Sequence, residues 1–233
     1  MTSDLELNKI LFQASIWVIP VLLAVTFHEA AHGWVAWKRG DDTAYMLGRV
    51  TFNPIKHIDP FGTVLLPAML LYFSGGQVMF GYAKPVPVNF NRLFHPRKDM
   101  VLVALAGPGV NLLLAIVGAF LFHTLSVFPP DVAEWITYNL GNLIWINLLL
   151  CVFNMLPIPP LDGGRVAVGL LPRYLAYRLA GLERTGMFII LGAIFLLPWL
   201  GGKLGMDLNI FWWIVGAPAS YLMGLIVNLA GIV

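Results

Sequence analysis

The chain has 233 residues, of which 59% are hydrophobic and only 11% charged, and its mean hydropathy is +0.80. Water-soluble domains carry about 25% charged residues, so this composition excludes such a domain and indicates a protein whose solvent is the lipid bilayer. The net charge of +2 is small and the basic residues are dispersed, which argues against nucleic acid as a partner. The only cysteine is Cys151, so a metal site would have to be built from histidines and carboxylates.

The first apolar stretch predicts a membrane-spanning helix over residues 10 to 37. Most of it is apolar, and a polar run that begins at Lys38 ends it. It lacks the pattern of a removable signal peptide, so we expect it to remain in the protein. Its last two turns are anomalous, because they carry His28, Glu29 and His32 where a lipid-facing helix would carry leucine or valine.

A doubtful apolar stretch is followed by two strong ones. Residues 60 to 82 are interrupted by Pro67 and by a Ser-Gly-Gly run, which favours a re-entrant or extended element over a simple span. Residues 100 to 128 and 132 to 156 are each long enough to cross a bilayer, and only a Pro-Pro-Asp run ending at Asp131 separates them. We expect them to form an antiparallel hairpin.

Beyond this hairpin the backbone is predicted to unwind. The run PIPPLDGGR, residues 157 to 165, contains three prolines and two glycines. Residues 165 to 184 are mildly amphipathic and typical of a helix at the membrane interface. Two further spans are expected near residues 185 to 200 and 208 to 233.

The anomalous residues of the first helix form the motif HEAAH at positions 28 to 32. His28 and His32 are four residues apart and share one helical face, so both imidazoles can reach one tetrahedral Zn²⁺, with Glu29 beside it. The alternative is a polar contact between helices. A carboxylate and two imidazoles are costly in an apolar helix, which favours the metal site.

A catalytic zinc ion needs a third protein ligand and one open position. Asp162 is the candidate, because it closely follows a span and lies in backbone predicted to be unwound near membrane depth. Four other aspartates lie in polar loops and need no special explanation: Asp41, Asp42, Asp99 and Asp131. Taken alone, PPLDGG is also a good turn, so the local sequence leaves both interpretations open.

Three further residues each have two interpretations. Asn154 could donate its amide to the oxyanion that develops during attack, or it could cap its helix or hydrogen-bond between helices. His57 could support a metal ligand, or it could be an ordinary loop histidine. Asn111 follows Gly107-Pro108-Gly109, which favours close helix packing over catalysis.

Two motifs together resemble the site-2 protease family of intramembrane zinc metalloproteases. One is HEAAH, and the other is NMLPIPPLDGG at residues 154 to 164, which is similar to the family pattern Asn-x-x-Pro-x-Pro-x-x-Asp-Gly. The resemblance covers most of residues 20 to 170. Shorter segments resemble the short, single-domain prokaryotic branch without a PDZ insertion: GRVTFNPIKHIDPFGT, KPVPVNF and ALAGPGVN.

The resemblance implies that His28, His32 and Asp162 bind one Zn²⁺, and that Glu29 takes a proton from the attacking water and delivers it to the leaving amine. We therefore expect an endopeptidase in the cell membrane of a prokaryote. Its substrate would be a peptide bond in or near the transmembrane segment of another membrane protein. The rival hypothesis is a zinc transporter or sensor, but that function needs no base between two ligands and would place polar groups along several spans.

The expected architecture is one all-α polytopic membrane domain over residues 1 to 233. It would contain five to six membrane segments, with a re-entrant or extended element between the first helix and the central hairpin. We place the catalytic core at about residues 10 to 170 and a C-terminal helical pair at about residues 185 to 233.

Basic residues predict the orientation of this domain, because cytoplasmic loops are rich in lysine and arginine. The loops at residues 38 to 59 and 83 to 99 share eight such side chains: Lys38, Arg39, Arg49, Lys56, Lys84, Arg92, Arg97 and Lys98. The connection that ends at Asp131 has none. Both loops are therefore expected on the cytoplasmic side, with residues 60 to 82 entering the membrane without crossing it.

Overall fold

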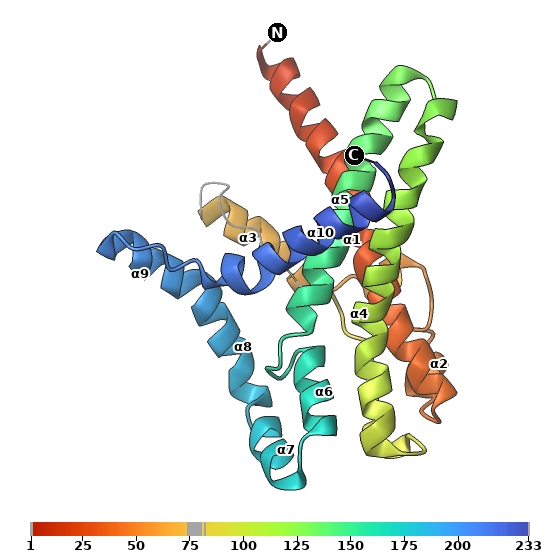
Figure 1. Ribbon diagram of the computed structural model, residues 1–233, viewed down its shortest axis with the longest axis vertical. Coiled ribbons are helices and arrows are strands. Elements are labelled where there is room, and N and C mark those ends of the chain that lie inside the picture. Colours follow the sequence, from red (N-terminus) through yellow and green to blue (C-terminus); the bar gives the residue numbers. More distant parts are fainter. Residues whose placement is uncertain (1, 74–80, 82, 233) are drawn as a thin grey trace.

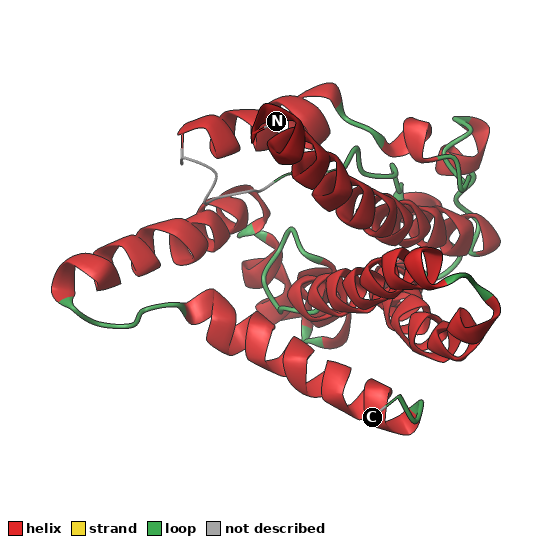
Figure 2. Cartoon of the chain, turned by 90° about the horizontal axis from the view of Figure 1, so that it is seen from above, coloured by secondary structure: helices red, strands yellow, loops and turns green. Residues whose placement is uncertain are grey.

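The computed structural model describes residues 2–73, 81 and 83–232, and every regular element among them is a helix (Figure 2). In this part of the chain five helical stretches are long and apolar enough to cross a membrane: Leu7–Lys38, Pro96–Val127, Pro130–Asn154, Glu183–Leu204 and Trp212–Leu229. The prediction of an all-α polytopic membrane protein is confirmed.

Three long helices form the body of the molecule. α1 (Thr2–Lys38) begins before its predicted start. α4 (Pro96–Leu121), prolonged by η4 (Phe122–Val127), and α5 (Pro130–Asn154) form the predicted hairpin. Each of α1, α4 and α5 packs against the other two, so side chains from all three meet in one interior (Figure 1).

A proline inside α1 leaves one backbone carbonyl of this helix without its usual hydrogen-bond donor, and a side chain of α5 supplies the donor. Pro20 has no N–H to offer the carbonyl of Ile16 one turn earlier. Asn142 of α5 donates its Nδ2 to that carbonyl at 2.9 Å. Hydrocarbon offers no water to do this, so Asn142 both satisfies α1 and ties it to α5.

α10 (Ala217–Leu229) packs on the α4–α5 hairpin through a core made largely of alanines. The buried members of this core are Ala115, Ala119, Ile144, Leu148, Ala219, Ile226 and Ala230. Small side chains allow helix backbones to approach closely, which is the main source of helix association in a bilayer. α10 is therefore packed against the central helices α4 and α5.

The two basic loops lie together at one end of the bundle. Asp41 is fully buried, and its Oδ2 accepts a hydrogen bond from the backbone N–H of Asn89 at 2.6 Å. Nη1 of Arg92 lies 2.6 Å from Oδ1 of Asp42. Figure 1 shows this end at the bottom, opposite the α4–α5 connection. The prediction that the two loops share a side is confirmed, and their cytoplasmic location stays a prediction.

The expected re-entrant element begins as a short helix. η2 (Pro60–Leu65) runs directly into α3 (Leu66–Phe73). The rest of this element, residues 74–80 and 82, lies outside the described part of the chain. Its re-entrant course therefore stays a prediction.

The segment after α5 differs in detail from the predicted interfacial helix at residues 165 to 184. It consists of two helices, α6 (Asp162–Leu170) and α7 (Arg173–Ala180), because Pro172 cannot continue a helix that precedes it.

The remaining elements complete the chain. α8 (Glu183–Leu191), η5 (Gly192–Leu196) and α9 (Leu197–Leu204) form one run, and η6 (Trp212–Gly216) leads into α10. The polar loops contain the short helical turns α2 (Thr43–Met46), η1 (Pro54–His57) and η3 (Phe90–Arg92).

Candidate metal centre

α1 presents the two histidines of HEAAH on one face, one helical turn apart. Their Nε2 atoms are 3.0 Å apart, and the rings meet edge to face with centroids 4.6 Å apart. Both residues are buried, with exposed fractions of 7% for His28 and 8% for His32. Two imidazole nitrogens this close together can bind the same metal ion.

Asp162 reaches the histidines because the chain folds back sharply after α5. Asp162 is the first residue of α6, where the sequence predicted unwound backbone. The prolines end at Pro160, so the following residues are free to start a helix. The fold-back depends on two glycines: a Cβ on Gly163 would overlap the carbonyl of Met155, and one on Gly164 would overlap the backbone of Pro159.

α8 supports this fold-back from the other side. Gly186, in the first turn of α8, lies so close to the carbonyl of Pro159 that a Cβ there would overlap it. The loop that carries Asp162 is therefore held between the end of α5 and the start of α8.

The three candidate ligand atoms fit one zinc ion. Oδ2 of Asp162 lies 3.2 Å from Nε2 of His28 and 3.2 Å from Nε2 of His32. Zinc–nitrogen bonds of about 2.0–2.1 Å place tetrahedral ligand atoms roughly 3.3 Å apart. The observed separations match this spacing and leave a further coordination position. Within the described ranges this is the only group of three such side chains close enough to hold a metal ion.

The Asp162 carboxyl is prepared to act as an anion. While no metal is bound, burial opposes its ionisation, but hydrogen bonds from His28 and His32, together with the charges of these rings when they are protonated, hold the pKa of the carboxyl well below its usual range. Its place at the start of α6 also puts the negative charge at the positive end of the helix dipole. Metal ligands must be deprotonated, and Asp162 meets this requirement at neutral pH.

α4 orients both histidines from one of its faces. His32 donates Nδ1–H to the carbonyl of Val103 at 2.7 Å, and His28 donates Nδ1–H to Oδ1 of Asn111 at 2.6 Å. These partners are oxygen atoms without protons, so Nδ1 must carry the proton in both rings. Nε2 then presents its lone pair to the metal position. Gly107 lies midway between Val103 and Asn111, one turn from each, and it leaves room for the ligand nitrogens.

Glu29 is held by the extended segment that precedes α4. Its Oε2 accepts the backbone N–H of Val86 at 2.7 Å. Lys84 in turn donates its N–H to the carbonyl of His57 at 3.0 Å, and its carbonyl accepts from Nη2 of Arg49 at 2.7 Å. The segment is thus fixed beside the HEAAH motif. The sequence did not reveal the contact of this segment with Glu29.

The other predicted residues have different surroundings. Asn154 donates its amide to the carbonyl of Leu150 at 3.1 Å, one turn back in the same helix, and its oxyanion role stays a prediction. His57 donates Nε2–H to the carbonyl of Thr51 at 3.0 Å, and within the described residues no hydrogen bond joins it to the candidate ligands. Asn111 contacts His28 directly, a contact that the sequence did not predict.

Comparison with known proteins decides the family. The model of peptidase family M50 matches residues 16–134 and 129–198, which together cover most of the chain. The chain belongs to family M50. This is the site-2 protease family, so the resemblance seen in the two motifs is confirmed.

Curated M50 relatives come from bacteria and archaea. The chain is 42% identical over 185 residues to the candidate zinc metalloprotease YwhC of Bacillus subtilis, an alignment that covers 78% of this chain and 80% of YwhC. It is 32% identical over 181 residues to the candidate zinc metalloprotease Rip2 of Mycobacterium tuberculosis, covering 78% and 66% of the two chains. It is 47% identical over 141 residues to the candidate zinc metalloprotease MJ0611 of Methanocaldococcus jannaschii, covering 60% and 62%. No solved structure matches the chain significantly.

This M50 protein is therefore a metalloprotease of the cell membrane with zinc as its cofactor, and the His28, His32 and Asp162 cluster is compatible with that metal.

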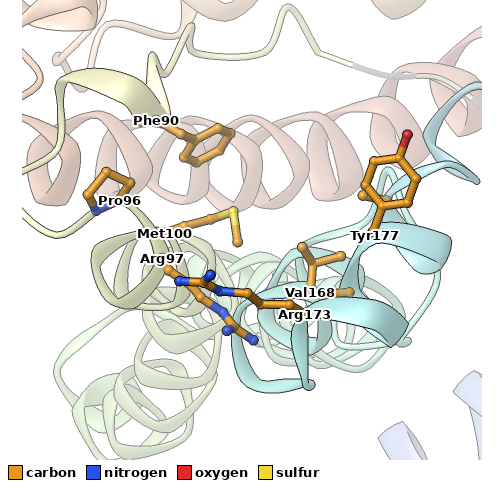
Figure 3. A pocket seen from close by; sticks show the side chains of 9 residues that line it. Phe90, Pro96, Arg97, Met100, Val168, Arg173 and Tyr177 are labelled. Atoms are coloured by element: carbon orange, nitrogen blue, oxygen red, sulfur yellow. The ribbon is translucent and has the colours of Figure 1, made fainter.

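A hollow of about 370 Å³ lies apart from the metal centre, and none of its lining residues is a candidate ligand (Figure 3). It is bounded by the start of α4 and by α6 and α7. Arg97 at its edge donates Nε–H to the carbonyl of Gly169 at 2.9 Å and a second N–H to the carbonyl of Leu171. The C-terminal end of α6 is thereby tied to α4, so the helix that begins with Asp162 is held at both ends.

Gly107→Ala is expected to weaken zinc binding by this M50 protein. The new Cβ would lie 2.5 Å from Nε2 of His32 and 2.6 Å from Nε2 of His28, which displaces the rings from the metal position. We expect zinc affinity to fall by at least about 10-fold, as for disturbed outer contacts of metal ligands. Metal analysis after dialysis against graded chelator measures it.

Gly109→Ala is the matched control, because a Cβ there meets nothing within 4 Å. Both substitutions raise helix propensity equally, so only the contact with the histidines differs. Equal zinc retention by the two variants would show that the absence of a side chain at position 107 is not needed for zinc binding.

Proposed function

We propose that this metalloprotease is an endopeptidase that cleaves membrane proteins in or near their transmembrane segments, with His28, His32 and Asp162 as its zinc ligands. The observation that supports this most directly is the position of the cluster. Its histidines lie on α1 and their partners on α4, and both helices are apolar enough to span a membrane. A site among such helices is suited to peptide bonds that enter from the bilayer.

Two side chains of this chain, Glu29 and Asn154, have separate roles in the proposed hydrolysis. When bound, zinc supplies a Lewis acid that polarises the scissile carbonyl and makes water nucleophilic at neutral pH. Glu29 lies between the two histidines in the sequence and is held by Val86, so it is placed to take a proton from the attacking water and return it to the leaving amine. Asn154 is proposed as the oxyanion donor, which requires its amide to leave the carbonyl of Leu150.

Substrate must reach this site as an extended strand, because a helix keeps its amides in internal hydrogen bonds. The segment around Val86 offers a surface for pairing. Lys84 and Val86 direct their N–H groups to protein partners, whereas the carbonyls of Pro85 and Pro87 have no hydrogen-bond partner among the described residues. These carbonyls can accept N–H groups from an unwound substrate strand.

The proposal is tested by mapping cleavage sites. The purified protein is reconstituted in liposomes with a library of single-span proteins, and the products are identified by mass spectrometry. We expect cuts within or beside the apolar segment that stop when a zinc chelator is added. Soluble peptides with the same flanking sequences are the control. Cleavage confined to the soluble peptides would show that the enzyme is a metalloprotease without an intramembrane substrate.

A further inference from the structure

We infer that Asn147 of α5 is a positioning residue of the metal centre, which acts through Asn111 to fix the tautomer and orientation of His28. The inference rests on the proposed role of His28 as a zinc ligand. Nothing in the sequence distinguishes Asn147 from the other asparagines of the same apolar helix.

A continuous chain of hydrogen bonds joins α5 to the metal position. Asn147 donates its Nδ2 to the carbonyl of Leu143 at 2.8 Å. Its Oδ1 accepts Nδ2 of Asn111 at 2.7 Å, and Oδ1 of Asn111 accepts Nδ1–H of His28 at 2.6 Å. Asn111 and Asn147 have no exposed surface.

This chain has a direction, because it begins at a backbone carbonyl that can only accept. The amide of Asn147 must therefore turn its nitrogen toward Leu143 and its oxygen toward Asn111. That oxygen, together with the carbonyl of Ala24 at 3.2 Å, requires the nitrogen of Asn111, which leaves its oxygen for His28. His28 then keeps its proton on Nδ1 and its lone pair on Nε2, as a zinc ligand needs.

Asn147 is not needed to supply a hydrogen-bond partner for any backbone group near it in α5. Asn142, five residues earlier on the same helix, satisfies the carbonyl that Pro20 leaves vacant. Leu143 lies inside α5 and has the N–H of residue 147 as its ordinary helical partner, so its carbonyl does not require a side chain. A fully buried amide in an apolar helix is costly unless it serves a polar partner. The partner that Asn147 serves is Asn111.

The test compares two asparagines of α5. Asn147→Leu breaks the chain to His28, whereas Asn142→Leu removes an interhelical hydrogen bond that leads to Ile16. Zinc dissociation constants are measured on the purified full chain by competition with a chromophoric chelator, and the Co²⁺-substituted proteins are compared by their absorption spectra. His28→Ala is the reference for loss of a ligand.

We expect Asn147→Leu to weaken zinc binding about 10-fold and to alter the Co²⁺ spectrum, since outer contacts of metal ligands typically contribute 10- to 100-fold. In this variant Asn111 can still donate to the carbonyl of Ala24, so we expect the loss of zinc affinity at the lower end of this range. Asn142→Leu should keep the wild-type zinc affinity and spectrum. If Asn147→Leu does not fold, Asn147→Thr gives the same test, because its hydroxyl can still donate to Leu143 but is too short to accept from Asn111.

The outcomes distinguish failure of the inference about Asn147 from failure of the proposed zinc ligand His28. Wild-type zinc affinity and spectrum in the Asn147 variants, with weakened binding in His28→Ala, overturn the inference and leave the proposed ligand in place. Unchanged zinc binding in His28→Ala overturns the ligand itself. An equal loss in Asn142→Leu and Asn147→Leu also overturns the inference, since it would reflect general packing of α5.

Discussion

Glu29→Gln is expected to abolish most turnover while leaving zinc in place, with kcat/KM falling by about 10²- to 10⁴-fold, the usual contribution of a general base. The amide oxygen of glutamine can still accept the N–H of Val86, so the side chain should keep its position. What is lost is the capacity to take a proton from water. Turnover of a fluorogenic membrane substrate and zinc content per chain are measured on the same preparation.

Glu134→Gln provides the control for the charge change, because Glu134 is exposed near the start of α5. It should retain wild-type activity and zinc. Wild-type turnover by Glu29→Gln would remove Glu29 from the reaction and reassign the base.

Asp162→Asn is expected to lose both zinc and activity. A neutral amide is a poor third ligand, and the carboxylate that lies 3.2 Å from both histidine nitrogens would be gone. Asparagine is similar in shape and tolerated at the start of a helix, so α6 should still form. We expect zinc affinity to fall by more than about 100-fold, beyond the range seen for outer contacts of metal ligands. Metal analysis after dialysis against graded chelator measures it.

Asp131→Asn is the matched control, since Asp131 is exposed in the first turn of α5. It should bind zinc as the wild type does. Full zinc occupancy in Asp162→Asn would assign the third ligand to another group.

The sequence predicted those parts of the structure that depend on run length and local spacing. Apolar runs of bilayer length indicated the α4–α5 hairpin, and the four-residue spacing of His28 and His32 placed them on one face of α1. The break between α6 and α7 was also visible in principle, because Pro172 marks it.

What the sequence did not predict depends on which helix faces meet. Val103 contributes only a backbone carbonyl to His32, and Gly107 contributes only the absence of a side chain. Neither leaves a chemical signature in a linear sequence. Asn111 and Asn147 are polar enough to be noticed, but nothing local says that one faces His28 and the other faces Asn111. Asp162 became the candidate ligand through its position after a span; its local sequence also fits a turn, and the family pattern then favoured the ligand.

The contact between Gly186 and the carbonyl of Pro159 bears on how this chain can change over evolution. Because the start of α8 touches the backbone of the loop that carries Asp162, the C-terminal helices cannot be exchanged or trimmed as a separate module. A gene truncated near residue 170 would still encode every candidate ligand, but it would lack α8, which packs against the loop next to Asp162. We therefore expect natural variation in α8 and in the PIPPLD loop to be correlated, with any larger residue at position 186 accompanied by a compensating change in that loop.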